Sequence, residues 1–208
     1  MPICPLPFDP AAAHMLYRRS LPHWRQAGTA YFVTFRLADA VPKAVLHQWL
    51  SETRVWLEQH PEPHTHELKW ERAAKIGRRL LGYLDTGCGT CLLRDPAARV
   101  EVEQAMLHFE GDRYLLGDYV IMPNHVHALV MPLGKADMGR IVASWTAYSA
   151  VRINRRNASS GKVWQGEPFD HIVRNRDAFA RFGKYIRENV GLLPADHATV
   201  GKGSLKWE

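Results

Sequence analysis

The sequence has little cysteine, no long apolar run and no glycine-rich phosphate loop. Its three cysteines, Cys4, Cys88 and Cys91, are too few for a disulfide framework and favour a reducing cytoplasm. No apolar run approaches the roughly 20 residues that span a bilayer, and the proline-rich start lacks the order of a signal peptide. A glycine-rich loop ending in lysine is also missing, so the sequence gives no sign of ATP-driven chemistry.

The composition is that of an ordinary globular chain. The 208 residues are 46% hydrophobic and 23% charged, which is enough to bury a full core without disulfides or a structural metal. We expect one domain over residues 1–208, with an irregular N-terminal segment at 1–28 and a tail at 191–208. Cys88 and Cys91 have the spacing of a metal or redox pair, but no second pair completes a zinc site, so two residues of a glycine-rich turn are the favoured interpretation.

The most informative stretch is 119–132, in which two apolar runs flank Pro123-Asn124. The second run, from His125 to Met131, is short and rich in strand-forming residues. Because alternate residues of a strand share a face, His125 and His127 should stand side by side. Two imidazoles can hold a metal ion, although a histidine pair is more often structural. An otherwise apolar strand makes unpaired rings costly, which favours a site.

Periodicity predicts the other elements. Apolar alternation indicates strands at 30–37, 114–122 and 169–173, and helical spacing indicates helices at 42–59, 67–84, 95–109, 137–156 and 177–189. In the 137–156 helix we expect Tyr148 to join the core stripe of Met138, Ile141 and Trp145. Strands interspersed with helices, including an antiparallel hairpin, predict an α+β fold.

Positive charge is concentrated in one quarter of the chain. The net charge is +6, and residues 140–190 contain ten basic and four acidic side chains, whereas the remainder has 17 of each. A solvated basic face is the usual explanation of such a cluster, but beside a candidate metal site it favours a polyanion, most simply nucleic acid. The candidate DNA contacts are Arg152, Arg155, Arg156, Lys162, Arg174, Arg176, Arg181, Lys184 and Arg187.

The last predicted helix offers a nucleophile and a further metal ligand. Tyr185 and Asn189 are four residues apart and therefore project from one helix face about one turn apart. Tyr185 could attack a phosphate, and the side-chain oxygen of Asn189 could complete a metal shell with the histidines. On spacing alone, however, Tyr185 is better explained as a tyrosine at the edge of the core.

The motifs resemble those of a known family. Residues 122–130, Met-Pro-Asn-His-Val-His-Ala-Leu-Val, closely resemble the histidine–hydrophobe–histidine motif of single-tyrosine transposases that act on single-stranded DNA, above all the REP-associated tyrosine transposases. Tyr185-Ile-Arg-Glu-Asn189 is similar to the family's tyrosine motif. Segments 28–37, 163–165 and 169–171 also resemble family segments in matching order, so the resemblance covers residues 24–190.

This resemblance implies a fold and a mechanism. The expected fold is a ferredoxin-like antiparallel sheet with helices packed mainly on one face and the histidine motif on a central strand. His125, His127 and Asn189 would hold Mg²⁺ or Mn²⁺, and Tyr185 would form a 5′-phosphotyrosine during cleavage and strand transfer. The implied substrate is single-stranded DNA with palindromic or hairpin elements, handled by a monomer or a dimer.

Three alternatives remain open at this point. The chain could bind nucleic acid through the same fold without strand transfer. It could be a metal-dependent hydrolase that uses water, in which case the Tyr185 hydroxyl would be dispensable. The histidines could also be purely structural, in which case the protein would have no metal affinity.

Overall fold

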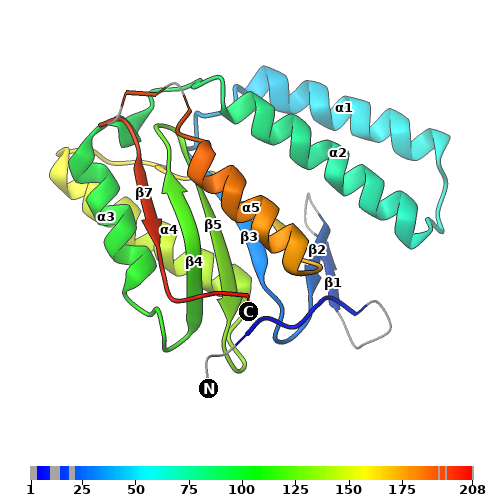
Figure 1. Cartoon of the computed structure of the whole chain (residues 1–208). Coiled ribbons are helices and arrows are strands. Elements are labelled where there is room, and N and C mark those ends of the chain that lie inside the picture. The colour runs from blue at the N-terminus through cyan, green and yellow to red at the C-terminus, as the bar shows by residue number, and fades with distance from the viewer. Residues whose placement is uncertain (1–3, 10–14, 19–21, 192, 195, 208) are drawn as a thin grey trace.

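A five-stranded antiparallel sheet forms the centre of the computed structural model, which describes residues 4–9, 15–18, 22–191, 193–194 and 196–207 (Figure 1). The strand order is β6-β3-β5-β4-β7. The strands are β3 (Tyr31–Arg36), β4 (Tyr114–Ile121), β5 (His125–Pro132), β6 (Phe169–Ile172) and β7 (Thr199–Lys202). The histidine motif thus lies on β5, the central strand, as expected.

Helices α3 (Pro96–Leu107) and α4 (Met138–Arg156) cover one face of this sheet. Their buried residues share one core with Val33, Phe35 and the other β3 side chains that point to that face. Helix α5 (Arg176–Glu188) covers the opposite face, where it packs on Phe32 and Leu129. The order β6-β3-β5-β4, with α3 and α4 as the crossing helices, is the predicted ferredoxin-like arrangement of an α+β fold.

Asparagine and aspartate side chains start the helices that flank the sheet. Asp95 and Asp137 cap α3 and α4 by accepting hydrogen bonds from Ala97 N and Arg140 N. Asn175 caps α5 in the same way. Each cap satisfies one of the backbone N–H groups that the first turn of a helix leaves without a partner, so these residues fix where the helices begin.

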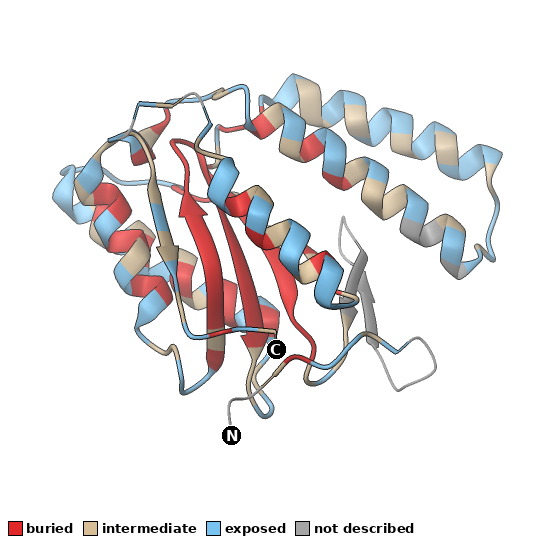
Figure 2. Cartoon of the chain, viewed as in Figure 1, coloured by how far each residue is buried: buried red, intermediate tan, exposed pale blue. Residues whose placement is uncertain are grey.

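Helices α1 (Lys43–Gln59) and α2 (His66–Leu84) form a hairpin that projects beyond the sheet (Figures 1 and 2). No residue of α1 is buried, whereas the C-terminal half of α2 buries Leu80 and Leu84. A Cβ atom added to Gly77 would lie 2.6 Å from the ring of Phe169 on β6, so the missing side chain lets α2 approach the edge of the sheet. The end of α2 is thereby held over the sheet. No described helix is long and apolar enough to cross a membrane.

The two chain ends differ from expectation. Within the segment predicted to be irregular, β1 (Met15–Arg18) and β2 (Pro22–Arg25) pair as a hairpin. The predicted C-terminal tail contributes β7, which pairs with β4. These short strands lack the apolar alternation by which strands are recognised. Tertiary contacts, such as the ion pair of Arg25 with Asp170 on β6, fix their positions instead.

Candidate metal and phosphoryl-transfer site

The two histidines lie side by side, fully buried, on the α5 face of the sheet. Their ring centroids are 4.4 Å apart, and neither side chain has accessible surface. Burial lowers the pKa of His125 to about 3. Burial, together with the neighbouring His125, also lowers the pKa of His127 well below its ordinary value. Both rings are therefore neutral at pH 7 and carry one free nitrogen lone pair each.

A hydrogen-bond chain fixes the tautomer of His125. The Asn124 amide nitrogen donates to the carbonyl oxygens of Leu84 and Cys88, at 3.2 and 3.0 Å. Because the amide nitrogen makes these two bonds, the other side-chain atom of Asn124 is the oxygen Oδ1. It lies 2.7 Å from His125 Nδ1 and can only accept a hydrogen bond. Nδ1 of His125 is therefore the protonated nitrogen, and Nε2 presents a lone pair. Partners that fix a ligand's tautomer in this way are typical of metal-binding histidines.

His127 is oriented by the neighbouring strand. Its Nδ1 lies 2.7 Å from the hydroxyl of Thr34, the residue directly opposite on β3. The ring also stacks on Phe32 at a centroid distance of 5.2 Å. Because Nδ1 is occupied by Thr34, the free position of His127 is again Nε2.

Helix α5 brings Tyr185 and Asn189 to the histidines. The Tyr185 ring lies 5.4 Å from that of His127, centroid to centroid, and packs edge-on against Phe32. Burial and then the charge of Asp85 raise the pKa of Tyr185. Asn189 is the C-terminal cap of α5, one turn beyond Tyr185.

Asp85 is a site residue that was not predicted from the sequence. It lies directly after α2, and its carboxylate, His125 and His127 each place a ligand atom within 4.8 Å of the others. Its Oδ1 is 3.5 Å from the Asn189 amide nitrogen. Partial burial raises the pKa of Asp85, while Asn189 lowers it. No local pattern marks this residue, because the tertiary packing of α2 brings it to the site.

Four of the polar atoms gathered here have no hydrogen-bond partner. Among the described residues, the buried side-chain atoms with no hydrogen-bond partner include His125 Nε2, His127 Nε2, Tyr185 Oη and Asn189 Oδ1. A buried polar atom without a partner costs about 1–3 kcal/mol. Two imidazole nitrogens, an amide oxygen and the carboxylate of Asp85 form a donor set that suits a divalent cation such as Mn²⁺. The residues present therefore fit the metal that the sequence implied.

The nine candidate DNA contacts divide into groups. Arg181, Lys184 and Arg187 line the exposed face of α5, although Arg187 is also paired with Asp118. On α4, Arg152 is paired with Glu101 at 2.9 Å, toward α3 rather than toward the histidines. The remaining candidates are the exposed Arg155, Arg156, Lys162 and Arg176 and the half-buried Arg174.

Tyr148 on α4 is 49% exposed, so the prediction that it joins the core stripe of this helix is wrong. The stripe that α4 presents to the sheet contains Ile141, Trp145 and Ser149 instead. From Trp145 the buried positions continue to Ser149, four residues on, and Tyr148 lies beside this stripe. It is thus remote from the histidine face, which belongs to α5.

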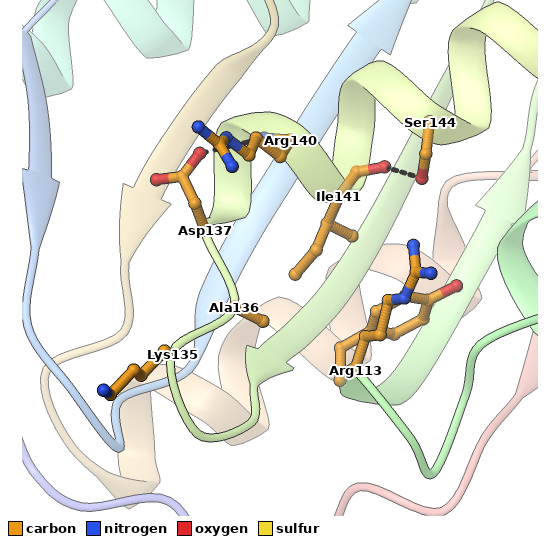
Figure 3. Close-up of a pocket in the computed structure, with 8 residues that line it drawn as sticks. Arg113, Lys135, Ala136, Asp137, Arg140, Ile141 and Ser144 are labelled. Carbon is orange, nitrogen blue, oxygen red and sulfur yellow. Dashed lines mark hydrogen bonds between the residues drawn. The ribbon is translucent and has the colours of Figure 1, made fainter.

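A hollow of about 450 Å³ lies away from the histidines, at the start of α4 (Figure 3). It is lined by Arg113, Lys135, Arg140 and Asp137 around the start of α4, where Asp137 accepts the capping hydrogen bond. Neighbouring Tyr114 pairs with the last residue of β5, whereas His125 is the first. The hollow is therefore separate from the histidine site.

No protein-family model matches this chain, and no curated protein matches it either. A solved structure of a REP-associated tyrosine transposase bound to a REP hairpin is similar over 84% of this chain and 71% of that one. The TM-score is 0.43 and the sequence identity 15%.

Proposed function

We propose that the chain is a metal-dependent enzyme that cuts and rejoins single-stranded DNA through a covalent 5′-phosphotyrosine on Tyr185, in the manner of the transposases it resembles. The observation that carries the proposal is the convergence of unpaired atoms, namely two histidine nitrogens, an amide oxygen and a tyrosine hydroxyl. A structural role would leave these atoms satisfied. A metal with a nearby nucleophile accounts for all four.

The site residues would divide the chemistry between them. His125, His127, Asn189 and Asp85 would hold the cation. A bound Mn²⁺ or Mg²⁺ supplies Lewis-acid polarisation of a phosphate oxygen. Tyr185 Oη attacks the phosphorus, a bond from phosphorus to the tyrosine oxygen forms, and the bond to the 3′ oxygen breaks. The tyrosine proton is lost, and the released 3′ oxygen gains one.

Basic residues on the same helix would guide the substrate. Arg181 and Lys184 lie on the exposed side of α5, next to Tyr185 in sequence, and Arg155 and Arg156 are exposed at the end of α4. A single strand is flexible enough to bring its phosphate down to a nucleophile held against the sheet. Binding should weaken as salt rises, because neutralised phosphates release counterions. Folded single strands with hairpins should bind more tightly than blunt duplex.

A hydrolase that uses water at the same metal site is the second candidate. The observation in its favour is the raised pKa of Tyr185, which makes the hydroxyl a poor nucleophile until its proton is removed. In that enzyme the phosphate would be transferred to water, and the Tyr185 hydroxyl would be dispensable.

One experiment separates these possibilities. Single-stranded DNA containing the palindromes that flank the gene, labelled at its 3′ end, is incubated with the protein and Mn²⁺ and resolved by denaturing electrophoresis. We expect a labelled band that migrates with the protein and disappears after protease treatment. Free 5′-phosphorylated product without that band would favour the hydrolase. Binding without cleavage would leave a nucleic-acid-binding protein.

A further inference from the structure

Arg36, the last residue of β3, is a buried arginine that the mechanism above does not use. Its side chain is only 8% exposed, and its Nη1 atom has no hydrogen-bond partner among the described residues. Burial lowers the pKa of Arg36, although Glu167 opposes this shift. Since an arginine stays protonated in proteins, the result is a buried positive charge with a free N–H group.

The register of the sheet places Arg36 beside the candidate metal ligands. Arg36 lies directly opposite His125, as Thr34 lies opposite His127. The 2.7 Å contact between Thr34 and His127 shows that facing residues of these strands share the α5 face. Side chains in such cross-strand pairs have Cβ atoms about 5 Å apart. The guanidinium therefore originates next to the His125 ring, on the face that carries Tyr185.

Another buried arginine shows what a structural role looks like. Arg99 is 5% exposed, and its guanidinium donates to the carbonyl oxygens of Leu93, Arg94 and Asp196 and to the hydroxyl of Thr199. All three of its nitrogens are used, and they tie the C-terminal segment to α3. Arg36 is almost as deeply buried but leaves Nη1 without a partner. This difference indicates a ligand rather than a structural contact.

We propose that Arg36 binds a non-bridging oxygen of the phosphate group that occupies the metal site. This inference rests on the proposed function, because it takes the site to be one for phosphodiesters. Guanidinium N–H groups match phosphate oxygens in geometry and charge. Charge builds on those oxygens as the nucleophile attacks, so a donor held ready in a buried site stabilises the transition state more than the ground state. Arg36 therefore serves both to seat the phosphate and to lower the barrier.

Binding of inorganic phosphate tests this assignment without any need for cleavage. Mn²⁺ is bound to the protein, phosphate is added, and ³¹P relaxation reports phosphate close to the ion. We expect Arg36→Gln to weaken phosphate binding about tenfold, the loss of one charge-assisted contact, with Mn²⁺ affinity unchanged. Arg36→Lys should recover part of the loss, because it keeps the charge without the planar fork. Arg54→Gln, which removes an exposed arginine of α1, is the matched control and should leave phosphate binding unchanged.

Equal phosphate affinity in the wild type and folded Arg36→Gln would overturn the assignment, as would phosphate that never approaches the ion in the wild type. If Arg36→Gln fails to fold, Arg36→Lys decides, because wild-type phosphate affinity in that variant would contradict fork-specific binding. Thermal melting and Mn²⁺ titration accompany each variant. Since the readout is phosphate near Mn²⁺, a wild type that binds phosphate but never cuts DNA would refute the proposed function and leave the Arg36 assignment standing.

A cleavage assay then locates the contact. DNA with a methylphosphonate at the scissile position lacks one charged non-bridging oxygen. We expect this change to slow the wild type about 10²-fold, as removal of one oxyanion contact does. It should slow Arg36→Gln far less, because the contact is already gone. If Arg36→Gln and the methylphosphonate slow cleavage independently, so that their effects multiply, Arg36 does not contact the reacting phosphate and the proposal is contradicted.

Discussion

The two faces of the sheet treat buried polar groups in opposite ways. On the face covered by α3 and α4, the Trp145 indole donates to the Tyr114 hydroxyl at 2.8 Å, and that hydroxyl donates to the Met106 carbonyl. Trp164 donates to the Ser149 hydroxyl at 3.0 Å, and Ser149 donates to the Trp145 carbonyl. Each of these groups has a partner, as is normal in a folded core.

On the α5 face several buried polar atoms converge without a hydrogen-bond partner. Histidine, tyrosine, asparagine and arginine side chains there each present a buried atom without a hydrogen bond. Each such atom costs stability, so this face gives up stability that the other keeps. The difference teaches that the α3–α4 face holds the fold together, whereas the α5 face is arranged for molecules that are not part of the chain.

The largest expected effect comes from the Tyr185 hydroxyl. Tyr185→Phe removes one oxygen atom, so we expect a folded protein that binds DNA and Mn²⁺ but forms no covalent adduct, with cleavage reduced at least 10³-fold. Gel detection of the adduct measures this. Tyr148→Phe is the matched control and should cut normally. An adduct that peptide mapping locates on Tyr148, or that survives in Tyr185→Phe, would refute the assignment.

The next effect concerns the metal. We expect His125→Ala or His127→Ala to weaken Mn²⁺ binding at least 100-fold and to abolish cleavage. Asp85→Asn should weaken Mn²⁺ binding about tenfold, because the amide keeps an oxygen but loses the charge. Calorimetric titration with Mn²⁺ gives the affinities. Thermal melting must accompany the histidine variants, because both side chains are fully buried. Wild-type Mn²⁺ affinity in any folded histidine variant would exclude the proposed ligand set.

A pair of identical substitutions compares the two faces directly. Tyr114→Phe leaves the Trp145 N–H and the Met106 carbonyl without their hydrogen-bond partner. We therefore expect a loss of about 1–3 kcal/mol in the free energy of unfolding, with cleavage retained. Tyr185→Phe removes a hydroxyl that has no partner, so the metal-free protein should be as stable as the wild type or slightly more stable. Urea unfolding measures both. Equal destabilisation by the two changes would erase the distinction between the faces.

A further effect, on stability alone, is the response to acid. Burial, followed by Arg174, lowers the pKa of His171 to about 4, and Asp170 only partly opposes this. The unfolded chain takes up the proton near pH 6.5 and the folded chain near 4, so stability falls as pH drops through this window. The slope is about 1.4 kcal/mol per pH unit for each such histidine. Urea unfolding of His171→Gln between pH 7 and 4 should show a slope smaller by one proton, and an unchanged slope would contradict the prediction.

Much of this molecule could be predicted from sequence, because local patterns determine it. The strand at 125–131 and the helix at 137–156 were placed to within one or two residues, since apolar periodicity marks them. The pairing of His125 with His127 followed from strand geometry alone. These features depend on neighbours within a few residues.

The missing features depend on contacts across the fold. Asp85 joins the site because α2 rests on the sheet edge at Gly77, 8 residues earlier in the chain. Arg36 faces the site through its register opposite His125, which no spacing within β3 reveals. Strand β7 is defined by its pairing with β4 more than by its own residues.

The short outer strands of the sheet also limit its edge-to-edge joining with other chains. Strands β6 and β7 are four residues each, whereas β4 and β5 have eight. Beside β6, Arg25 from β2 forms an ion pair with Asp170. Short and covered edges offer few free backbone groups to another chain, and this is how natural sheets avoid joining edge to edge. The inner strands β3, β5 and β4 are paired on both sides, so the strand that carries the histidines presents no free edge to another chain.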